Sequence, residues 1–204
     1  MRPFYSIIVM KGKVFSMGRY TTRTLTKEQY IEIIETIRNG FLKVRPNNEV
    51  ATVLVLEANL GIRVGDVLNL TLKSIVKDGN RYRLDIVEQK TGKERKFTVL
   101  TEVYNYIRQY CIDNDIKSKD KIFTITSRQV QRILQKAVDY LGYEDISTHS
   151  FRKFYATEMY YNNGNDYRLV QELLQHESIT TTEKYLGISR EKMEKAIQGH
   201  NNLV

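Results

Sequence analysis

Two stretches toward the C-terminal end of the chain carry its most informative pattern: residues 148–153 read THSFRK, and residues 173–185 read LLQHESITTTEKY. His149 and Arg152 stand three positions apart, so on a helical turn both side chains leave the same face. His176 precedes Tyr185 by nine residues, and the Ser and Thr residues between them can begin a new short helix. This region therefore offers a phenol, two imidazoles and a guanidinium, a set that can hold a phosphodiester and attack it.

The rest of the chain predicts a mainly helical (α+β) domain. Apolar spacing and capping signals predict a first helix that is capped by Thr24 or Thr26 and stopped at Asn39-Gly40. They predict further helices over 48–60, 62–70, 101–112, 127–141, 150–163, 166–175, 180–186 and 189–197. Residues 81–87 and 94–100 are rich in β-forming residues around a Lys- and Gly-containing turn, which predicts an antiparallel hairpin. No repeat or low-complexity linker divides residues 1–204, so we expect a single domain with a small antiparallel sheet.

The charge distribution points to a polyanionic partner. The net charge is +8, and residues 1–50 hold 9 Lys/Arg against 4 Asp/Glu, whereas residues 101–204 are balanced. Residues 1–24 contain five basic residues and no acid, and they fit a basic arm or a short hairpin. Nucleic acid is the commonest partner of a basic half of this kind. The alternative is that these charges form an exposed face that only keeps the protein soluble. The single Cys111 excludes an internal disulfide, and no apolar run is long enough to span a bilayer, so we expect a cytoplasmic protein.

These motifs resemble the C-terminal signature of the tyrosine recombinases, the phage integrase family: H-x-x-R, then L-L-x-H, then a Tyr nine residues later. Residues 60–70, LGIRVGDVLNL, are similar to the first arginine motif of that family. The resemblance covers roughly residues 25–190 and implies the helical catalytic domain of that type. It also implies a short form that lacks the N-terminal core-binding domain, similar in length to the fimbrial-type invertases.

Two positions depart from the family pattern. Lys153 stands where many members carry a second histidine, and Gln175 stands where a glycine usually precedes the histidine of L-L-x-H. The second change affects local backbone freedom, and neither change removes a catalytic group.

The resemblance implies a set of catalytic residues. They are Arg63, Lys90, His149, Arg152, His176 and Tyr185. The two arginines would hold non-bridging phosphate oxygens with their planar forks, and the second histidine would add a third hydrogen bond. The first histidine is the candidate base for the tyrosine, and the lysine would protonate the departing 5′ oxygen. The acid at position 66, Asp66, would orient the first arginine.

Simpler interpretations stand beside these roles. Arg63 and Asp66 can be an ordinary i,i+3 pair on a helix, worth a few tenths of a kcal/mol. Lys93 competes with Lys90 as the proton donor, because both flank the expected turn. Tyr185 is one of 14 tyrosines and can be a packing residue with its hydroxyl at the surface.

The function that the resemblance implies is site-specific DNA recombination, by an integrase or an invertase, through a covalent 3′-phosphotyrosine intermediate. Neither a metal, a cofactor nor ATP is expected. The expected partners are double-stranded DNA with specific sites, other copies of the chain in a tetramer on paired sites, and an accessory DNA-bending protein. Such a protein would be associated with the nucleoid, and residues 188–204 would form a C-terminal helix and tail that docks in trans. A topoisomerase of type IB and a non-catalytic DNA-binding regulator are the alternatives.

Overall fold

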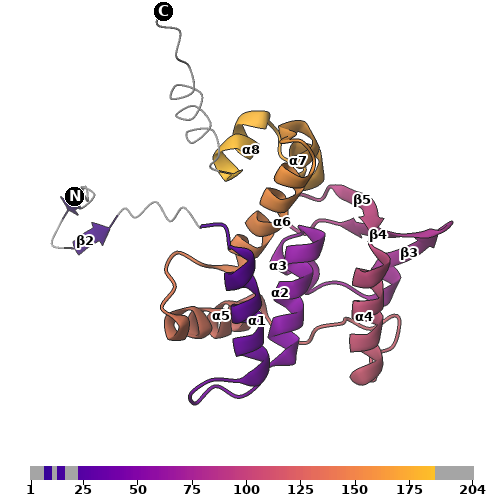
Figure 1. The fold of residues 1–204 in the computed structure, drawn as a ribbon, viewed down its shortest axis with the longest axis horizontal. Coiled ribbons are helices and arrows are strands. Elements are labelled where there is room, and N and C mark those ends of the chain that lie inside the picture. The colour runs from indigo at the N-terminus through magenta and orange to yellow at the C-terminus, as the bar shows by residue number, and fades with distance from the viewer. Residues whose placement is uncertain (1–6, 11–12, 17–22, 187–204) are drawn as a thin grey trace, which may run out of the picture.

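The protein is a helical body with a small sheet on one side (Figure 1). The computed structural model describes residues 7–10, 13–16 and 23–186. The helices are α1 (Lys27–Asn39), α2 (Asn48–Leu60), α3 (Val64–Val67), η1 (Leu72–Ser74), α4 (Thr101–Asp113), α5 (Ser127–Leu141), α6 (Thr148–Asn162), α7 (Tyr167–Leu174) and α8 (Ile179–Leu186). The strands are β1 (Ile7–Met10), β2 (Lys13–Ser16), β3 (Ile75–Asp78), β4 (Arg81–Val87) and β5 (Glu94–Val99). The predicted class, mainly helical with a small antiparallel sheet, is confirmed.

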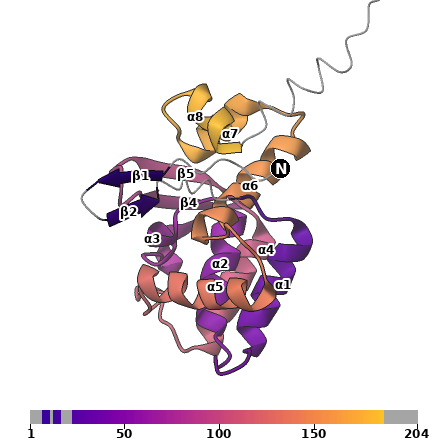
Figure 2. The same cartoon turned by 90° about the vertical axis from the view of Figure 1, so that its left-hand side faces the viewer.

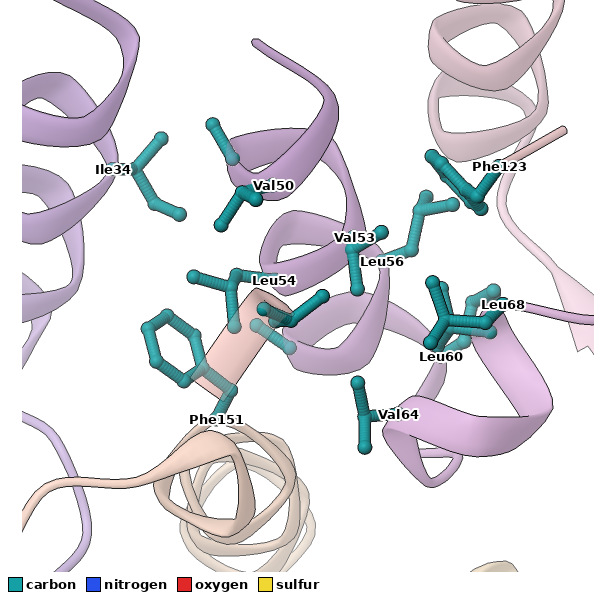
Figure 3. Packing of buried hydrophobic residues seen from close by; sticks show 14 of the residues in the cluster. Ile34, Val50, Val53, Leu54, Leu56, Leu60, Val64, Leu68, Phe123 and Phe151 are labelled. Carbon is teal, nitrogen blue, oxygen red and sulfur yellow. The ribbon is translucent and has the colours of Figure 1, made fainter. Parts of the chain in front are cut away.

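Helix α2 is the centre of the body. Its residues are apolar on almost every side, so the helix must be covered by other elements on all sides. It packs against α1, α3, α5 and α6. Figure 3 shows Phe151 of α6 facing Leu54 of α2, with Ile34 of α1 on another side of the same helix. This packing fixes α6, which carries the H-x-x-R motif, directly against the helix that leads into Arg63.

The sheet consists of β3, β4 and β5 in that order, paired antiparallel. Leu84 lies at its middle, opposite Ile75 on one side and Phe97 on the other, and it is fully buried. Helix α4 packs against β4. The hairpin of β4 and β5 was predicted, but β3 was not, because its four residues are too few to show an alternation of their own.

Helix α3 is shorter than the sequence predicted. The expected helix over 62–70 contains a helix only at 64–67, because Arg63 is extended (φ −73°, ψ 150°). The chain then turns so that the carbonyl of Leu70 accepts a hydrogen bond from the N–H of Ile122 at 2.9 Å.

Near the N-terminus, β1 and β2 pair as an antiparallel hairpin. The remainder of the N-terminal arm and the predicted helix at 189–197 lie outside the described residues. Within the described ranges, no helix is both long enough and apolar enough to cross a membrane.

A second, smaller core lies where α7 and α8 meet α6. Its buried members are Tyr155, Ala156, Tyr160, Val170 and Leu174, with Tyr185 packed against them. Figures 1 and 2 both show α7 and α8 together beyond the main body, at one end of α6. The motifs singled out in the sequence therefore converge where this small core meets α2 and the β4–β5 hairpin.

Candidate active site

Arg63 is placed by the end of α2. Gly61 caps that helix in the left-handed conformation (φ 59°), and a Cβ there would lie 2.2 Å from the ring of Tyr155, so this position requires glycine. The extended backbone at Arg63 then turns its side chain toward the hairpin, and its Nη1 lies 2.5 Å from Oε2 of Glu88. The Arg63 side chain remains 24% exposed, so the rest of its guanidinium is accessible.

The prediction that Asp66 orients Arg63 is wrong. Asp66 is buried, and its Oδ1 accepts a hydrogen bond of 2.8 Å from the backbone N–H of Gln89. The short α3 explains the difference, since the extended residue 63 is not on a helical face with residue 66. Asp66 instead ties α3 to the hairpin, one residue before Lys90.

Lys90 lies in the turn between β4 and β5, and its side chain is exposed. The turn closes through hydrogen bonds from Glu88 N–H to Lys93 carbonyl (2.9 Å) and from Gly92 N–H to Glu88 carbonyl (2.8 Å), with Gly92 at φ 66°. The Lys90 ammonium is close enough to His149 to help lower the pKa of that imidazole. The choice between Lys90 and Lys93 as proton donor stays a prediction.

His149 and Arg152 share one face of α6, as their spacing predicted, but their surroundings differ. Arg152 is buried, and its Nη2 donates to the carbonyl of Leu174 at 3.0 Å. Its Nη1 is also buried and has no hydrogen-bond partner among the described residues. His149 keeps part of its surface exposed. Burial of the remainder, together with the cations Arg152 and Arg63, lowers the pKa of its imidazole. His149 is therefore neutral at neutral pH.

His176 follows the end of α7. Gln175 takes the left-handed conformation (φ 52°) that glycine usually supplies, and its N–H bonds back to the helix. The Gln175 side-chain amide donates to the carbonyl of Glu94 at 2.8 Å, which joins this helix end to β5. Burial, with the charges of Arg152 and Arg63, lowers the pKa of His176 to about 4, so its ring is neutral.

Tyr185 lies on α8 with its ring edge toward His176, at 5.1 Å between ring centroids and 77° between planes. The ammonium of Lys153 lies 5.3 Å from the centre of the Tyr185 ring. The hydroxyl is buried and lies beside the guanidinium of Arg152. Burial raises the pKa of Tyr185 to about 12, and the nearby Arg152 guanidinium opposes this rise without cancelling it. The surface-packing interpretation does not describe this residue, because its reactive atom is inside.

Two buried residues of the site were missed by sequence reasoning. Glu88 and Arg95 form an ion pair at 3.1 Å, with side chains 1% and 2% exposed. Arg95 stands at every-second-residue spacing with Phe97 and Val99, on the same inward face of β5. That spacing is a sequence signal that predicts burial of Arg95. Burial alone would raise the pKa of Glu88, but hydrogen bonds from Arg63 and Thr91 outweigh it and lower that pKa.

A third missed residue is Glu57, which is fully buried in the apolar α2. Its carboxyl oxygens are buried, and the backbone N–H of Val64 and the guanidinium of Arg152 are the polar groups that act on them. Burial raises the pKa of Glu57 well above its ordinary value, and the charge of Arg152 only partly offsets this effect. The one acid within an otherwise apolar helix was visible in the sequence, although its burial was not.

The six predicted site residues are connected by charge interactions in the folded protein. The charges of Arg152 and Arg63 each favour a lower pKa for His149, His176 and Tyr185. The charge of Lys90 favours a lower pKa for His149. In the described part of the chain, no three His, Cys, Asp or Glu side chains gather where they could hold a metal ion. The arrangement places two arginines near a neutral imidazole and a buried phenol, a set of groups that can bind an anion.

Residues 23–192 match the family model described as "Phage integrase family". The chain is similar to tyrosine recombinase XerA of Pyrococcus furiosus, at 28% identity over 89% of this chain and 63% of that protein. It is also similar to tyrosine recombinase XerC of Leptospira interrogans serovar copenhageni, at 31% identity over 96% of this chain and 67% of that protein. The chain thus spans about two thirds of the length of these relatives.

Solved structures share the fold. The XerH site-specific recombinase bound to palindromic difH substrate superposes with a TM-score of 0.66 at 20% identity, over 88% of this chain and 53% of that one. The catalytic domain of bacteriophage HP1 integrase gives a TM-score of 0.60 at 17% identity, over 87% and 95%. With the family match over most of the chain, these findings establish that this protein belongs to the phage integrase family.

Proposed function

We propose that this protein is a site-specific DNA recombinase, an integrase or an invertase, that cuts and rejoins DNA through a covalent 3′-phosphotyrosine on Tyr185. The observation that carries the proposal is the buried Tyr185 hydroxyl beside the buried guanidinium of Arg152, whose Nη1 has no hydrogen-bond partner among the described residues. Buried polar groups are normally hydrogen bonded, so the Nη1 donor beside the phenol calls for an acceptor, which a bound anion would supply. A phosphodiester supplies both an anionic oxygen for the guanidinium and a phosphorus atom for the phenol.

Charge stabilisation in this proposal comes from three side chains. Arg63 and Arg152 donate to the non-bridging oxygens, on which negative charge develops in the transition state. His176 is neutral and therefore donates a third hydrogen bond without adding another charge to the pocket. With the guanidinium groups in this role, the reaction needs no metal.

Proton transfer involves the other three residues. The phenol of Tyr185 has its pKa raised to about 12, so attack requires a base, and the neutral His149 is the base that we assign. The Tyr185 oxygen bonds to phosphorus as the bond to the 5′ oxygen breaks, and Lys90 protonates that leaving oxygen. The reverse attack by a 5′ hydroxyl rejoins the strand, and the phosphotyrosine retains the bond energy, so ATP is not needed.

A trapping experiment tests the proposal. Duplexes enriched from a random-sequence library by binding to the protein are nicked near each candidate scissile bond, so that the cut fragment diffuses away and covalent protein–DNA adduct accumulates. Wild type should form the adduct, and Tyr185→Phe should bind the DNA but form none. Tyr161→Phe is the matched control, because Tyr161 is an exposed tyrosine at the end of α6. Adduct formation by Tyr185→Phe would refute the assignment.

Other outcomes separate the alternatives. A wild-type protein that binds a specific duplex without any adduct would be a non-catalytic DNA-binding regulator. A protein that relaxes supercoiled plasmid as a monomer, without exchanging strands between paired sites, would act as a type IB topoisomerase.

We propose further that the protein assembles as a tetramer on paired sites, with a DNA-bending accessory protein, in association with the nucleoid.

Residues 188–200 lie outside the described residues, and their sequence carries a narrow apolar stripe at Met193, Ala196 and Ile197. So small a stripe suits a groove on a neighbouring copy. Truncation after Gly187 should leave adduct formation on a single site intact and abolish exchange between paired sites. Normal exchange by the truncated chain would contradict docking in trans.

A further inference from the structure

Glu88 is the only carboxylate that contacts an arginine of the candidate site among the described residues. Its Oε2 lies 2.5 Å from Nη1 of Arg63, and the same oxygen accepts a hydrogen bond of 2.9 Å from the hydroxyl of Thr91. Its Oε1 accepts from Nη1 of Arg95 at 3.1 Å. One buried side chain thus joins Arg63, the residue before α3, to Thr91 in the hairpin turn and to Arg95 on β5.

Arg95 anchors this carboxylate in the body of the protein. Its Nη2 donates to the carbonyl of Leu173, at the end of α7, and lies 3.4 Å from the carbonyl of Gly61, at the end of α2. Burial, with the nearby charge of Arg152, lowers the pKa of Arg95 to about 10, which leaves it charged at neutral pH. The anchor therefore stays ionised and connects β5 with two helix ends that flank the site.

The turn that carries Lys90 is held on both sides. The preceding residue, Gln89, donates its backbone N–H to Asp66 at 2.8 Å. The following residue, Thr91, donates its hydroxyl to Glu88 at 2.9 Å. An exposed lysine has many rotamers, but its backbone is restrained here from two directions, and this restraint limits where the ammonium can reach.

We propose that Glu88, anchored by Arg95, is a positioning residue with two branches: it orients Arg63 directly, and it holds the Lys90 turn through Thr91. The inference rests on the proposed recombinase function and adds residues that the sequence motifs did not include. A positioning role of this kind predicts two separable defects, one in charge stabilisation and one in proton donation to the leaving oxygen.

A sulfur substitution in DNA separates the two branches. Replacing the bridging 5′ oxygen at the scissile bond by sulfur creates a thiolate leaving group, and thiols ionise far more readily than alcohols, so departure needs no proton donor. Lys90→Ala should therefore be slow on the oxygen substrate and close to wild type on the sulfur substrate. Arg63→Ala should be slow on both substrates, because its loss is unrelated to the leaving group.

The variants are Thr91→Val, Glu88→Gln and the matched control Thr98→Val, which alters an exposed threonine on β5. In single-turnover adduct formation on oxygen DNA, we expect Thr91→Val to be about tenfold slower and Glu88→Gln about a hundredfold slower, the loss that a misplaced group can cause. On sulfur DNA, Thr91→Val should recover to within threefold of wild type. Glu88→Gln should recover only in part, since its Arg63 branch remains broken.

Several outcomes would overturn the inference. Wild-type rates for Thr91→Val and Glu88→Gln on oxygen DNA would show that neither branch positions anything. A Thr91→Val defect that persists unchanged on sulfur DNA would exclude an action through Lys90. If Glu88→Gln failed to fold, the exposed Thr91 would still test the hairpin branch. A wild-type protein that formed no adduct on either substrate would instead refute the proposed function, and with it the inference.

Discussion

The imidazole of His176 is held by Thr182: its Nδ1 lies 3.0 Å from the Thr182 hydroxyl oxygen. Thr182 is fully buried one turn into α8, three residues before Tyr185. A neutral ring that accepts the threonine proton at Nδ1 carries its own proton at Nε2, where it can donate to a phosphate oxygen. The contact therefore couples the orientation of His176 to the helix that carries the candidate nucleophile.

Thr182→Val should remove this control of the histidine while keeping the shape of the side chain. We expect adduct formation to fall about 10- to 100-fold, somewhat less than the loss of a complete donor, with DNA affinity unchanged. Single-turnover kinetics and a binding titration measure the two effects. Thr180→Val, at an exposed position of the same helix, is the matched control. An unimpaired Thr182→Val would mean that the Nδ1 contact has no part in the reaction.

Substitution of either arginine should slow cleavage, and substitution of Arg152 should also lower the free energy of unfolding. Arg63→Ala and Arg152→Ala should each slow cleavage by at least the roughly 10²–10³ expected for losing one oxyanion-type donor. Arg152→Ala should also reduce the free energy of unfolding by about 1–3 kcal/mol, because it leaves the buried carbonyl of Leu174 without its donor. Cleavage within threefold of wild type by either variant would remove that arginine from the site.

Glu57 should make the stability of the protein depend on pH. Its folded-state pKa is raised well above its ordinary value by burial, so the folded protein keeps a proton that the unfolded chain releases near pH 4.5. The contribution of Glu57 to the free energy of unfolding is therefore fully present below pH 4.5. It is lost as pH rises through the pKa of Glu57 in the folded protein. Glu57→Gln cannot titrate, so its unfolding free energy relative to wild type should increase as pH rises from 4 to 7. Urea unfolding at several pH values measures this, and a pH-independent difference would contradict the burial effect.

Gln175 occupies a backbone conformation that favours glycine. Gln175→Ala and Gln175→Gly both lose the side-chain hydrogen bond to Glu94, so the comparison between them isolates the backbone. Because alanine retains the strain at φ 52° and glycine does not, Gln175→Gly should be more stable than Gln175→Ala by about 1 kcal/mol. Equal midpoints in urea would show that the left-handed conformation costs nothing there.

The basic N-terminal segment should contribute to DNA binding through charge. Deleting residues 1–22 removes Arg2, Lys11, Lys13 and Arg19 but keeps the hydrogen bond from Arg23 N–H to the Asp145 carbonyl. Binding should weaken, and its dependence on salt should flatten by about 0.9 in the log–log slope for each lost phosphate contact. A full-length variant with these four residues changed to Gln should behave like the deletion. An unchanged slope would mean that the segment does not lie on DNA.

Much of the fold could be predicted because its signals are local. Capping residues and apolar spacing set the bounds of α1, α2 and α5, and each of these follows from contacts within three or four residues. Strand β3 and the late start of α3 could not be predicted in this way. Four residues pair as β3 because β4 lies beside them, and α3 begins only after the extended Arg63, whose side chain contacts the distant Glu88.

The chemical groups that are available follow from the amino-acid sequence, and so does the shared face of His149 and Arg152, since that depends only on helical spacing. The sequence also identified the family, because the spacing from His176 to Tyr185 is a one-dimensional pattern. That Glu88 rather than Asp66 contacts Arg63 depends on the three-dimensional fold, because residues 25 positions apart meet only when α3 packs on the hairpin. The fold also raises the pKa of Tyr185 and lowers that of His176. Both shifts are due mainly to loss of water around the group, and desolvation depends on which surfaces come together in space rather than on neighbours along the chain.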